Sequence, residues 1–232
     1  MKNYSVITDV GRKRKSNQDN YYVGENWCIV ADGMGGHKGG ETASRCAIEI
    51  IKTNLAQQAF GVDSLLKGAI ADANKALYNM SINDPSLEGM GTTAVLCYFE
   101  GAVAYVAHVG DSRAYHLTEL GLRQLTNDHS IVQQLIESGT ITPKEAKTHP
   151  QKNLITRAIG TESTIDVDVC TVNIKEGDYI LLCTDGLTSF VSDSEIEAVV
   201  KAMGLDDAVT KLVNMANSSG GTDNITIVLI KV

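Results

Sequence analysis

The chain has 232 residues, 43% of them hydrophobic, and a formal net charge of −8 at pH 7. A chain of this length buries about 70–75% of the surface that its unfolded form exposes, so a single domain needs no disulfide to be stable. The acidic charge argues against general binding to nucleic acids or to anionic membranes. The five cysteines form no C-x-x-C pair, which favours reduced core residues in a cytoplasmic protein.

No stretch marks a targeting segment or a domain boundary. The N-terminal segment lacks the apolar region of a signal peptide, and no apolar run reaches the roughly 20 residues that span a bilayer. Repeats, low-complexity tracts and proline-rich linkers are also absent from the sequence. We therefore expect residues 1–232 to form one cytoplasmic domain without a membrane anchor.

In chain order, runs rich in Val, Ile and aromatic residues predict short strands. These runs are 4–10, 27–31, 93–99, 102–109, 178–183 and 225–230. Apolar residues at three- and four-residue spacing predict helices over 43–55 and 64–80. The sequences TPKE from Thr142 and SDSE from Ser192 fit capping boxes, which begin helices. Helices early and late, with strands clustered between them, favour a layered α+β fold with antiparallel sheets.

The stretch IVADGMGGHKGGETAS at 29–44 places Asp32 at the end of an apolar run, followed by five glycines within 33–40. It fits neither glycine-rich phosphate loop, because Lys38 breaks both the G-x-x-x-x-G-K-[ST] and the G-x-G-x-x-G spacing. The glycines instead allow the backbone to approach a ligand closely. An aspartate beside glycine or threonine at the end of an apolar run recurs at Asp111, Asp185 and Asp223.

Each aspartate of this kind could be an ordinary turn residue, because Asp-Gly is a common turn pair. Aspartates on separate segments converge only if the sheets bring the strand ends together. Clustered carboxylates repel one another unless cations neutralise them, and oxygen ligands suit Mg²⁺ or Mn²⁺. Zinc is disfavoured, since paired Cys/His spacing is absent from the sequence. Two such ions would activate water for an in-line displacement at phosphorus.

Eight ordered motifs carry a resemblance to a known family: RKSNQD, DGMGGHKGG, GTTAV, HVGDSRAY, LTNDHS, ITRAIG, CTDGL and GGTDNIT. They resemble the motifs of the metal-dependent (type 2C, PPM) serine/threonine protein phosphatases, and most of all those of the bacterial branch. The similarity runs from about Tyr4 to Val232. It implies a four-layer αββα fold, in which a central β-sandwich of two antiparallel sheets is flanked by helices. It also implies a flap, a mobile segment beside the cleft, at about 131–156.

The resemblance further implies the ligands of a dinuclear Mn²⁺ or Mg²⁺ centre. Asp32 would bridge the two ions, and the carbonyl oxygen of Gly33 would bind one of them. Asp185 and Asp223 would be the other direct ligands. Asp19 would reach the ions through water.

Further site residues follow from the same resemblance. Asp111 and Asp185 would hold a third, weaker ion. Arg14 would receive the substrate phosphate, for which the guanidinium fork is well suited. Animal members place a histidine where this chain has Met34, so the nearby His37 is a candidate either to protonate the leaving oxygen or to orient water. His108 and His129 are expected to make hydrogen bonds near the core or in a turn.

The predicted activity is hydrolysis of phosphoserine and phosphothreonine in proteins by metal-activated water, without a covalent enzyme intermediate. The expected partners are phosphorylated proteins, including a serine/threonine kinase and its substrates, and a monomer is expected. Two alternatives share the same residues. One is a phosphatase that acts mainly on a small phosphorylated metabolite, and the other is a non-catalytic regulator that binds phosphoproteins on the same scaffold.

Overall fold

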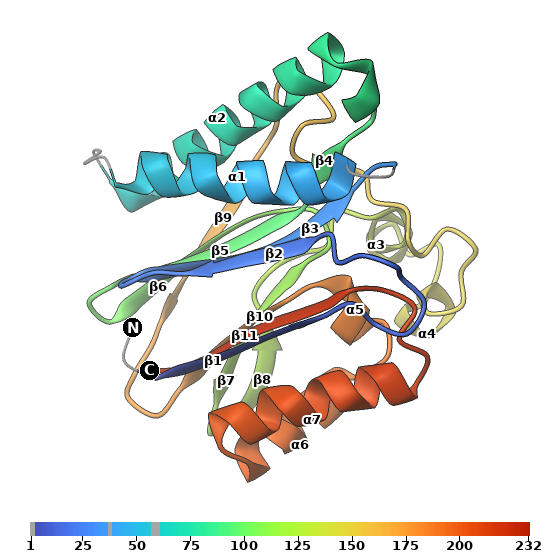
Figure 1. Ribbon diagram of the computed structural model, residues 1–232. Coiled ribbons are helices and arrows are strands. Elements are labelled where there is room, and N and C mark those ends of the chain that lie inside the picture. Colours follow the sequence, from blue (N-terminus) through green and yellow to red (C-terminus); the bar gives the residue numbers. More distant parts are fainter. Residues whose placement is uncertain (1–2, 37–38, 57–60) are drawn as a thin grey trace.

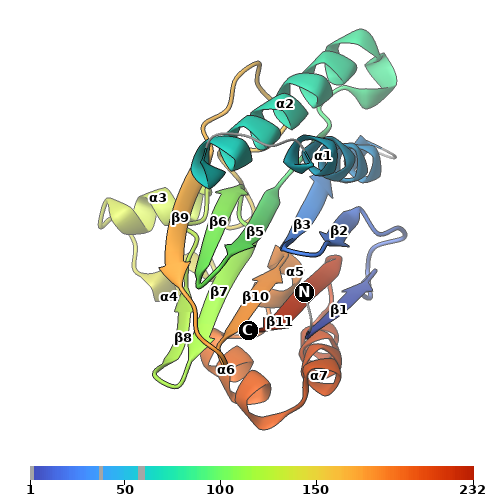
Figure 2. The same cartoon turned by 90° about the vertical axis from the view of Figure 1, so that its left-hand side faces the viewer.

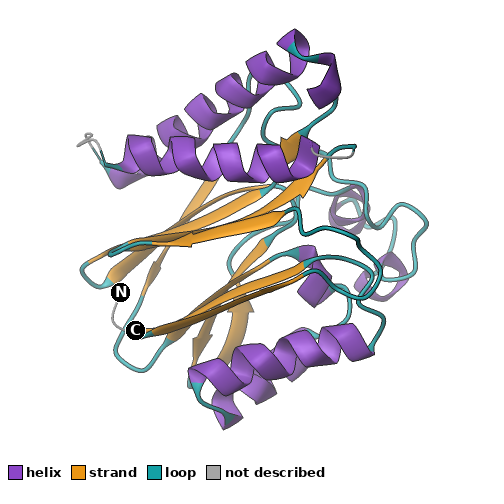
Figure 3. Ribbon diagram, in the orientation of Figure 1, coloured by secondary structure: helices purple, strands orange, loops and turns teal. Residues whose placement is uncertain are grey.

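A computed structural model describes residues 3–36, 39–56 and 61–232 of the chain. Its strands form two antiparallel sheets that face each other, and a pair of helices covers the outer side of each sheet (Figure 1). Figure 3 shows the resulting layers, helix, sheet, sheet and helix, by colour. The αββα sandwich expected from the sequence is therefore confirmed.

The sheet beneath α1 and α2 has the strand order β2-β3-β5-β6-β9, and β4 pairs with β3 beside this path. Helices α1 (Gly39–Leu55) and α2 (Val62–Asn83) cover it, and the short 3-10 turn η1 (Pro85–Leu87) follows them. The strands are β2 (Asp19–Val23), β3 (Trp27–Met34), β4 (Gly91–Thr92), β5 (Ala94–Glu100), β6 (Val103–Val109) and β9 (Asp168–Asn173).

The second sheet has the strand order β1-β11-β10-β7-β8 and is covered by α6 (Asp193–Ala202) and α7 (Leu205–Ser218). The single-turn helix α5 (Asp185–Thr188) follows β10 directly. The strands are β1 (Tyr4–Asp9), β7 (Arg113–Thr118), β8 (Gly121–Gln124), β10 (Tyr179–Cys183) and β11 (Ile225–Lys231). Figure 2 shows from a second side that the helix pairs lie on opposite faces of the sandwich.

Apolar side chains fill all three spaces between the layers. In β3, Ile29 belongs to the cluster under α1 and α2, whereas its neighbours Cys28 and Val30 belong to the cluster between the sheets. This alternation follows from the period of two in a strand. Because β3 is buried on both faces, it reads in the sequence as a continuous apolar run that ends at Asp32.

The predicted helices at 43–55 and 64–80 are confirmed as α1 and α2, and all the predicted strands are present. Both capping boxes form, at Thr142 before α4 (Pro143–Ala146) and at Ser192 before α6. Reduced core cysteines are expected from the sequence, and Cys28, Cys97 and Cys183, which lie in strands, are buried and free. None of the helices in the described ranges has both the length and the apolar character needed to cross a membrane.

Candidate metal centre

The aspartates predicted at strand ends line one cavity of about 240 Å³. Asp32 lies near the end of β3, Asp111 follows β6, Asp185 follows β10, and Asp223 precedes β11. These strand ends belong to both sheets and meet at one edge of the sandwich, beside α5 and the segment that carries α3 (Ile131–Glu137) and α4 (Figure 1). The convergence expected from the sequence is therefore present in the fold.

Asp19 lies next to this cavity, directly opposite Asp32 in the antiparallel pair of β2 and β3. Its side chain is buried, and Oδ2 accepts hydrogen bonds from Thr184 Oγ1 at 2.9 Å and from Thr226 Oγ1 at 2.7 Å. Within the described part of the chain, Asp19 Oδ1 and Asp185 Oδ1 are buried without a hydrogen-bond partner. A buried polar atom left in this way costs free energy unless a ligand satisfies it.

The pKa values of several carboxyl groups in this cluster are raised above their usual values. Burial raises the pKa of Asp19 to about 7, that of Asp111 to about 8 and that of Asp185 to about 6. The pKa of Asp32 is also raised well above its usual value, mainly by burial and next by the charge of Asp19. Carboxylates arranged in this way ionise together only if cations compensate their charge, so the donor set fits divalent ions with oxygen ligands.

The glycines after Asp32 allow a close approach of two backbone segments. A Cβ atom at Gly33 would collide with the carbonyl oxygen of Gly40, and one at Gly40 would press on the carbonyl oxygen of Gly33. Helix α1 can therefore begin directly against the end of β3. On the other side, Thr93 N donates to Asp32 O at 2.8 Å, and Asp32 N donates to Thr93 Oγ1 at 3.0 Å. Thr93 thus binds both polar backbone groups of Asp32.

Arg14 lies at the cavity, as the sequence predicts for a phosphate-binding residue. Its Nη2 donates to Asp223 Oδ2 at 2.7 Å, and the two side chains are 50% and 29% exposed. An ion pair with this exposure contributes about 0–1 kcal/mol, so another anion can replace Asp223 at little cost.

The predicted flap lies beside the same cavity. Asn153 and Ile155 line it, and Ile155 forms an isolated bridge with Ser130, which caps the N-terminus of α3. The two arms of the segment are therefore joined at their base. His37, the candidate either to protonate the leaving oxygen or to orient water, lies outside the described residues.

Asn224 is a further site residue, and sequence reasoning assigned it no role. Its Oδ1 accepts a hydrogen bond from Gln18 N at 2.8 Å, and its Nδ2 donates to Val10 O and Ser16 O, both at 3.0 Å. These bonds hold the segment that contains Arg14 against the start of β11. The motif GGTDNIT includes Asn224, but the hydrogen-bond partners of its side chain are backbone atoms far away in the sequence.

A two-sheet sandwich between helix pairs, with a cavity of buried carboxylates at one edge, is the arrangement that the sequence resemblance implies for a metal-dependent phosphatase. Residues 11–229 match the family model of protein phosphatase 2C. The chain belongs to this family, in its bacterial branch, and is therefore an enzyme, a metal-dependent protein phosphatase.

Named relatives and solved structures agree with this assignment. The chain is 40% identical over 235 residues to the serine/threonine phosphatase stp of Listeria monocytogenes serotype 4b, which covers 97% of this chain and 93% of that protein. The crystal structure of the Mycobacterium tuberculosis serine/threonine phosphatase PstP/Ppp has a TM-score of 0.93 at 36% identity, with 99% and 97% of the two chains covered. A structure of the PstP catalytic domain in complex with two manganese ions has a TM-score of 0.90 at 34% identity, covering 98% and 96%.

Proposed function

We propose that this chain hydrolyses phosphoserine and phosphothreonine in proteins at a dinuclear Mn²⁺ or Mg²⁺ centre. The observation that carries the proposal is the cavity lined by Asp32, Asp185 and Asp223, beside which buried carboxylate oxygens lack hydrogen-bond partners in the described ranges. A relative at 40% identity is named a serine/threonine phosphatase, and a similar structure contains two manganese ions. Both support the proposal.

The ligand roles are those that the family resemblance implies, and the lining of the cavity agrees with them. Asp32 would hold both ions, and the carbonyl oxygen of Gly33 would hold one of them. Asp185 and Asp223 bind from the opposite sheet, and Asp19 acts through water. When bound, such ions supply an activated water and neutralise the negative charge of the phosphoryl group. Asp111 and Asp185 together hold a third, weaker ion.

Arg14 binds the phosphate of the substrate. Only its Nη2 is used in a hydrogen bond within the described part of the chain, so its other N–H groups remain to donate to phosphate oxygens. Planar guanidinium groups make such bonds in pairs. The exposed ion pair with Asp223 keeps the side chain directed at the cavity.

Water, and not a side chain, attacks phosphorus in this proposal. Thr93 has the one hydroxyl among the described cavity-lining side chains, and its Oγ1 is engaged by Ser112 Oγ at 2.8 Å and by the backbone of Asp32. The P–O ester bond breaks as the water oxygen bonds to phosphorus, and the leaving serine or threonine oxygen takes up a proton. His37 is the proposed donor of that proton.

The proposed substrates are phosphorylated proteins, including a serine/threonine kinase and its targets. Residues 1–232 are proposed to form one catalytic domain that acts as a monomer. The segment 131–156 acts as a flap that influences substrate choice, because Asn153 and Ile155 lie at the cavity where a peptide would enter.

The test is phosphate release from matched phosphothreonine, phosphoserine and phosphotyrosine peptides, and from a small sugar phosphate, with Mn²⁺, Mg²⁺ or EDTA. We expect metal-dependent turnover of the phosphothreonine and phosphoserine peptides above that of the other substrates. Preference for the sugar phosphate would replace the proposal with a metabolite phosphatase. Peptide binding without turnover under any metal would indicate a regulator.

A further inference from the structure

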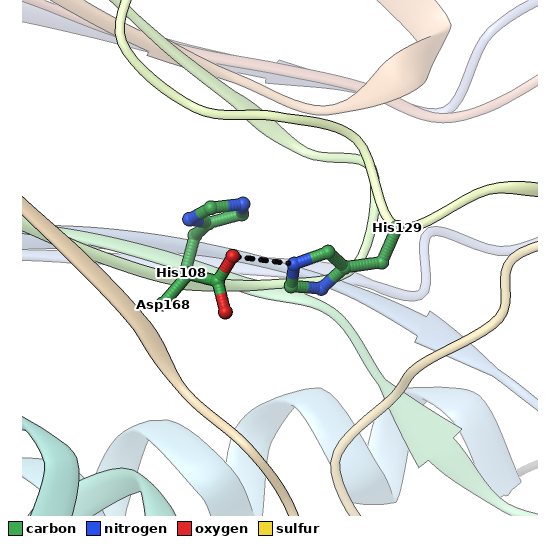
Figure 4. A group of neighbouring side chains, drawn as sticks. All are labelled: His108, His129 and Asp168. Atoms are coloured by element: carbon green, nitrogen blue, oxygen red, sulfur yellow. Dashed lines mark ion pairs between the residues drawn. The ribbon is translucent and has the colours of Figure 1, made fainter. Parts of the chain in front are cut away.

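Beside the proposed metal centre, side chains from three segments form a second cluster: His108 of β6, His129 before α3, and Asp168 of β9 (Figure 4). Candidate ligand atoms of the three lie within 4.8 Å of one another, and Asp168 pairs with His108 across the strands. Two imidazoles and a carboxylate can bind a metal ion. The surroundings of this cluster, however, favour a different role.

A cation of the chain itself already lies at this cluster. Arg157 Nη1 is 2.8 Å from Asp168 Oδ1 and 3.1 Å from His129 Nε2. The rings of His108 and His129 are stacked, with centroids 4.6 Å apart and an angle of 22° between the planes. Stacked rings direct their lone pairs side by side, and not toward a common ion. The cluster is therefore complete without a metal.

Hydrogen bonds determine the protonation of His129. Gly110 N donates to His129 Nδ1 at 3.0 Å, and since a backbone N–H can only donate, Nδ1 carries no proton. The proton is on Nε2, which is 3.3 Å from Asp168 Oδ2, the contact drawn as a dashed line in Figure 4. Because Nε2 and Arg157 Nη1 are then both donors, Arg157 bonds to Asp168 and not to the imidazole. Burial lowers the pKa of His129, in agreement with a neutral ring. Asp168 therefore orients the imidazole, and the imidazole accepts from Gly110.

Gly110 belongs to the turn that carries Asp111. His129 N also donates to Gly110 O at 3.0 Å, so His129 binds both polar backbone groups of that glycine. Gly110 has φ +102°, and a Cβ atom there would collide with Thr93. Ser112 Oγ is 2.8 Å from Thr93 Oγ1 on the far side of the turn. The turn around Asp111 is thus held between Thr93 and His129.

The same histidine contacts the end of the flap. Thr156 N donates to His129 O at 2.7 Å, and Arg157 follows Thr156 directly. His129 therefore joins the returning arm of the flap to the turn before Asp111 through separate atoms, its carbonyl oxygen on one side and Nδ1 on the other. Nε2 is linked to Arg157, at the end of the flap, only by way of Asp168.

We propose that His129 is a positioning residue, which sets the Gly110–Asp111 turn through Nδ1 and ties the end of the flap to that turn through its carbonyl oxygen and, by way of Asp168 and Arg157, through Nε2. The proposal rests on the function proposed above, because the turn matters for turnover only if Asp111 is a metal ligand. It adds a residue that touches neither the substrate nor an ion.

Two substitutions of His129 separate the contact made through Nδ1 from the contact made through Nε2. In His129→Asn, the amide oxygen is as many bonds from Cα as Nδ1 and can still accept from Gly110, but nothing replaces Nε2. In His129→Gln, the amide reaches the place of Nε2 and leaves the Gly110 N–H without an acceptor. His116→Gln is the matched control, because His116 is also buried and bonded to a carboxylate, Asp178 at 2.9 Å, near the opposite end of β10.

The first readout is exchange of the Gly110 amide hydrogen in metal-free protein, followed by NMR. We expect exchange about tenfold or more faster in His129→Gln than in wild type, because a buried N–H loses its partner. The second readout is the Mn²⁺ concentration for half-maximal phosphopeptide hydrolysis, which should rise about tenfold in the same variant. His129→Asn should keep both values near wild type but raise KM for the phosphopeptide.

Equal behaviour of the Asn and Gln variants, or a change limited to the melting temperature as in His116→Gln, would overturn the proposal. Zinc that wild-type protein retains through gel filtration and His108→Ala loses would also overturn it, by making the cluster a metal site. If His129→Gln does not fold, His129→Leu, which keeps apolar bulk but offers the Gly110 N–H no acceptor, replaces it and should change both readouts in the same direction. Amide exchange requires no activity, so it remains decisive even if wild type proves not to be a metal-dependent phosphatase.

Discussion

Asp19 and Asp32 lie directly opposite each other in the antiparallel pair of β2 and β3, with Asp19 buried and Asp32 facing the cavity. Like charges in this arrangement destabilise a sheet. The pair is tolerated because two threonine hydroxyls bind Asp19 and because divalent ions would neutralise Asp32.

Replacing one buried ionisable group should therefore stabilise the metal-free protein. We expect Asp32→Asn to unfold at a higher temperature than wild type in EDTA, and to gain little stability from Mn²⁺. Thermal unfolding with and without Mn²⁺ measures both effects. An equal gain from Mn²⁺ in the variant and in wild type would contradict Asp32 as a ligand.

The metal-free protein should lose stability as the pH rises. The folded-state pKa values of Asp19, about 7, and Asp111, about 8, lie above the ordinary value of 3.8, so the folded protein holds protons that the unfolded chain releases. Their contribution is fully present below about pH 4 and is lost as the pH rises to about 8. Urea unfolding in EDTA across this range measures the loss, and Asp111→Asn should reduce it. A rise in stability over the same pH interval would contradict the prediction.

Asp185→Asn removes a charge and little volume, so the variant should fold. Since even outer partners of metal ligands contribute about 10- to 100-fold, loss of a direct ligand should lower kcat at least about 100-fold. Circular dichroism checks the fold and phosphopeptide hydrolysis checks the rate. Undiminished wild-type turnover in exhaustive EDTA would rule out the metal mechanism altogether.

Asp111→Ala tests the third ion. If Asp111 binds only that ion, the variant should keep two ions, hydrolyse more slowly and require a different Mn²⁺ concentration. Anomalous scattering from Mn²⁺-soaked crystals of wild type and variant counts the sites. A third site that persists in the variant would refute the assignment.

Arg14→Ala should lower kcat/KM by about 10- to 100-fold, because hydrogen bonds to charged groups contribute about 1.5–3 kcal/mol and 1.36 kcal/mol corresponds to tenfold. The neighbours Lys13 and Lys15 are exposed, so Lys13→Ala and Lys15→Ala should have far smaller effects. All three are compared on one phosphopeptide at several salt concentrations. Three similar losses that shrink at high salt would show a diffuse basic face instead of a phosphate contact.

Local patterns in the sequence predicted the central elements of the fold because these elements carry their own signals. Strands such as β3, β5 and β11 are buried apolar runs, and α4 and α6 begin with capping boxes. Helix α7 was missed although it is amphipathic, since Gly204 before it makes no side-chain cap. The edge strand β9 was also missed, because its partly exposed residues give no continuous apolar run.

The sequence by itself also located the aspartates that line the cavity, because an aspartate beside glycine or threonine at the end of a strand is a local feature. Only the tertiary structure decided what surrounds them. Thr184 and Thr226, which bind Asp19, are 165 and 207 positions away from it in the chain. The link from His129 to the turn before Asp111 likewise depends on how separate segments meet. A carboxylate's place on its own strand is set by neighbours along the chain, whereas its hydrogen-bond partners and its pKa are set by segments of the opposite sheet that pack against it.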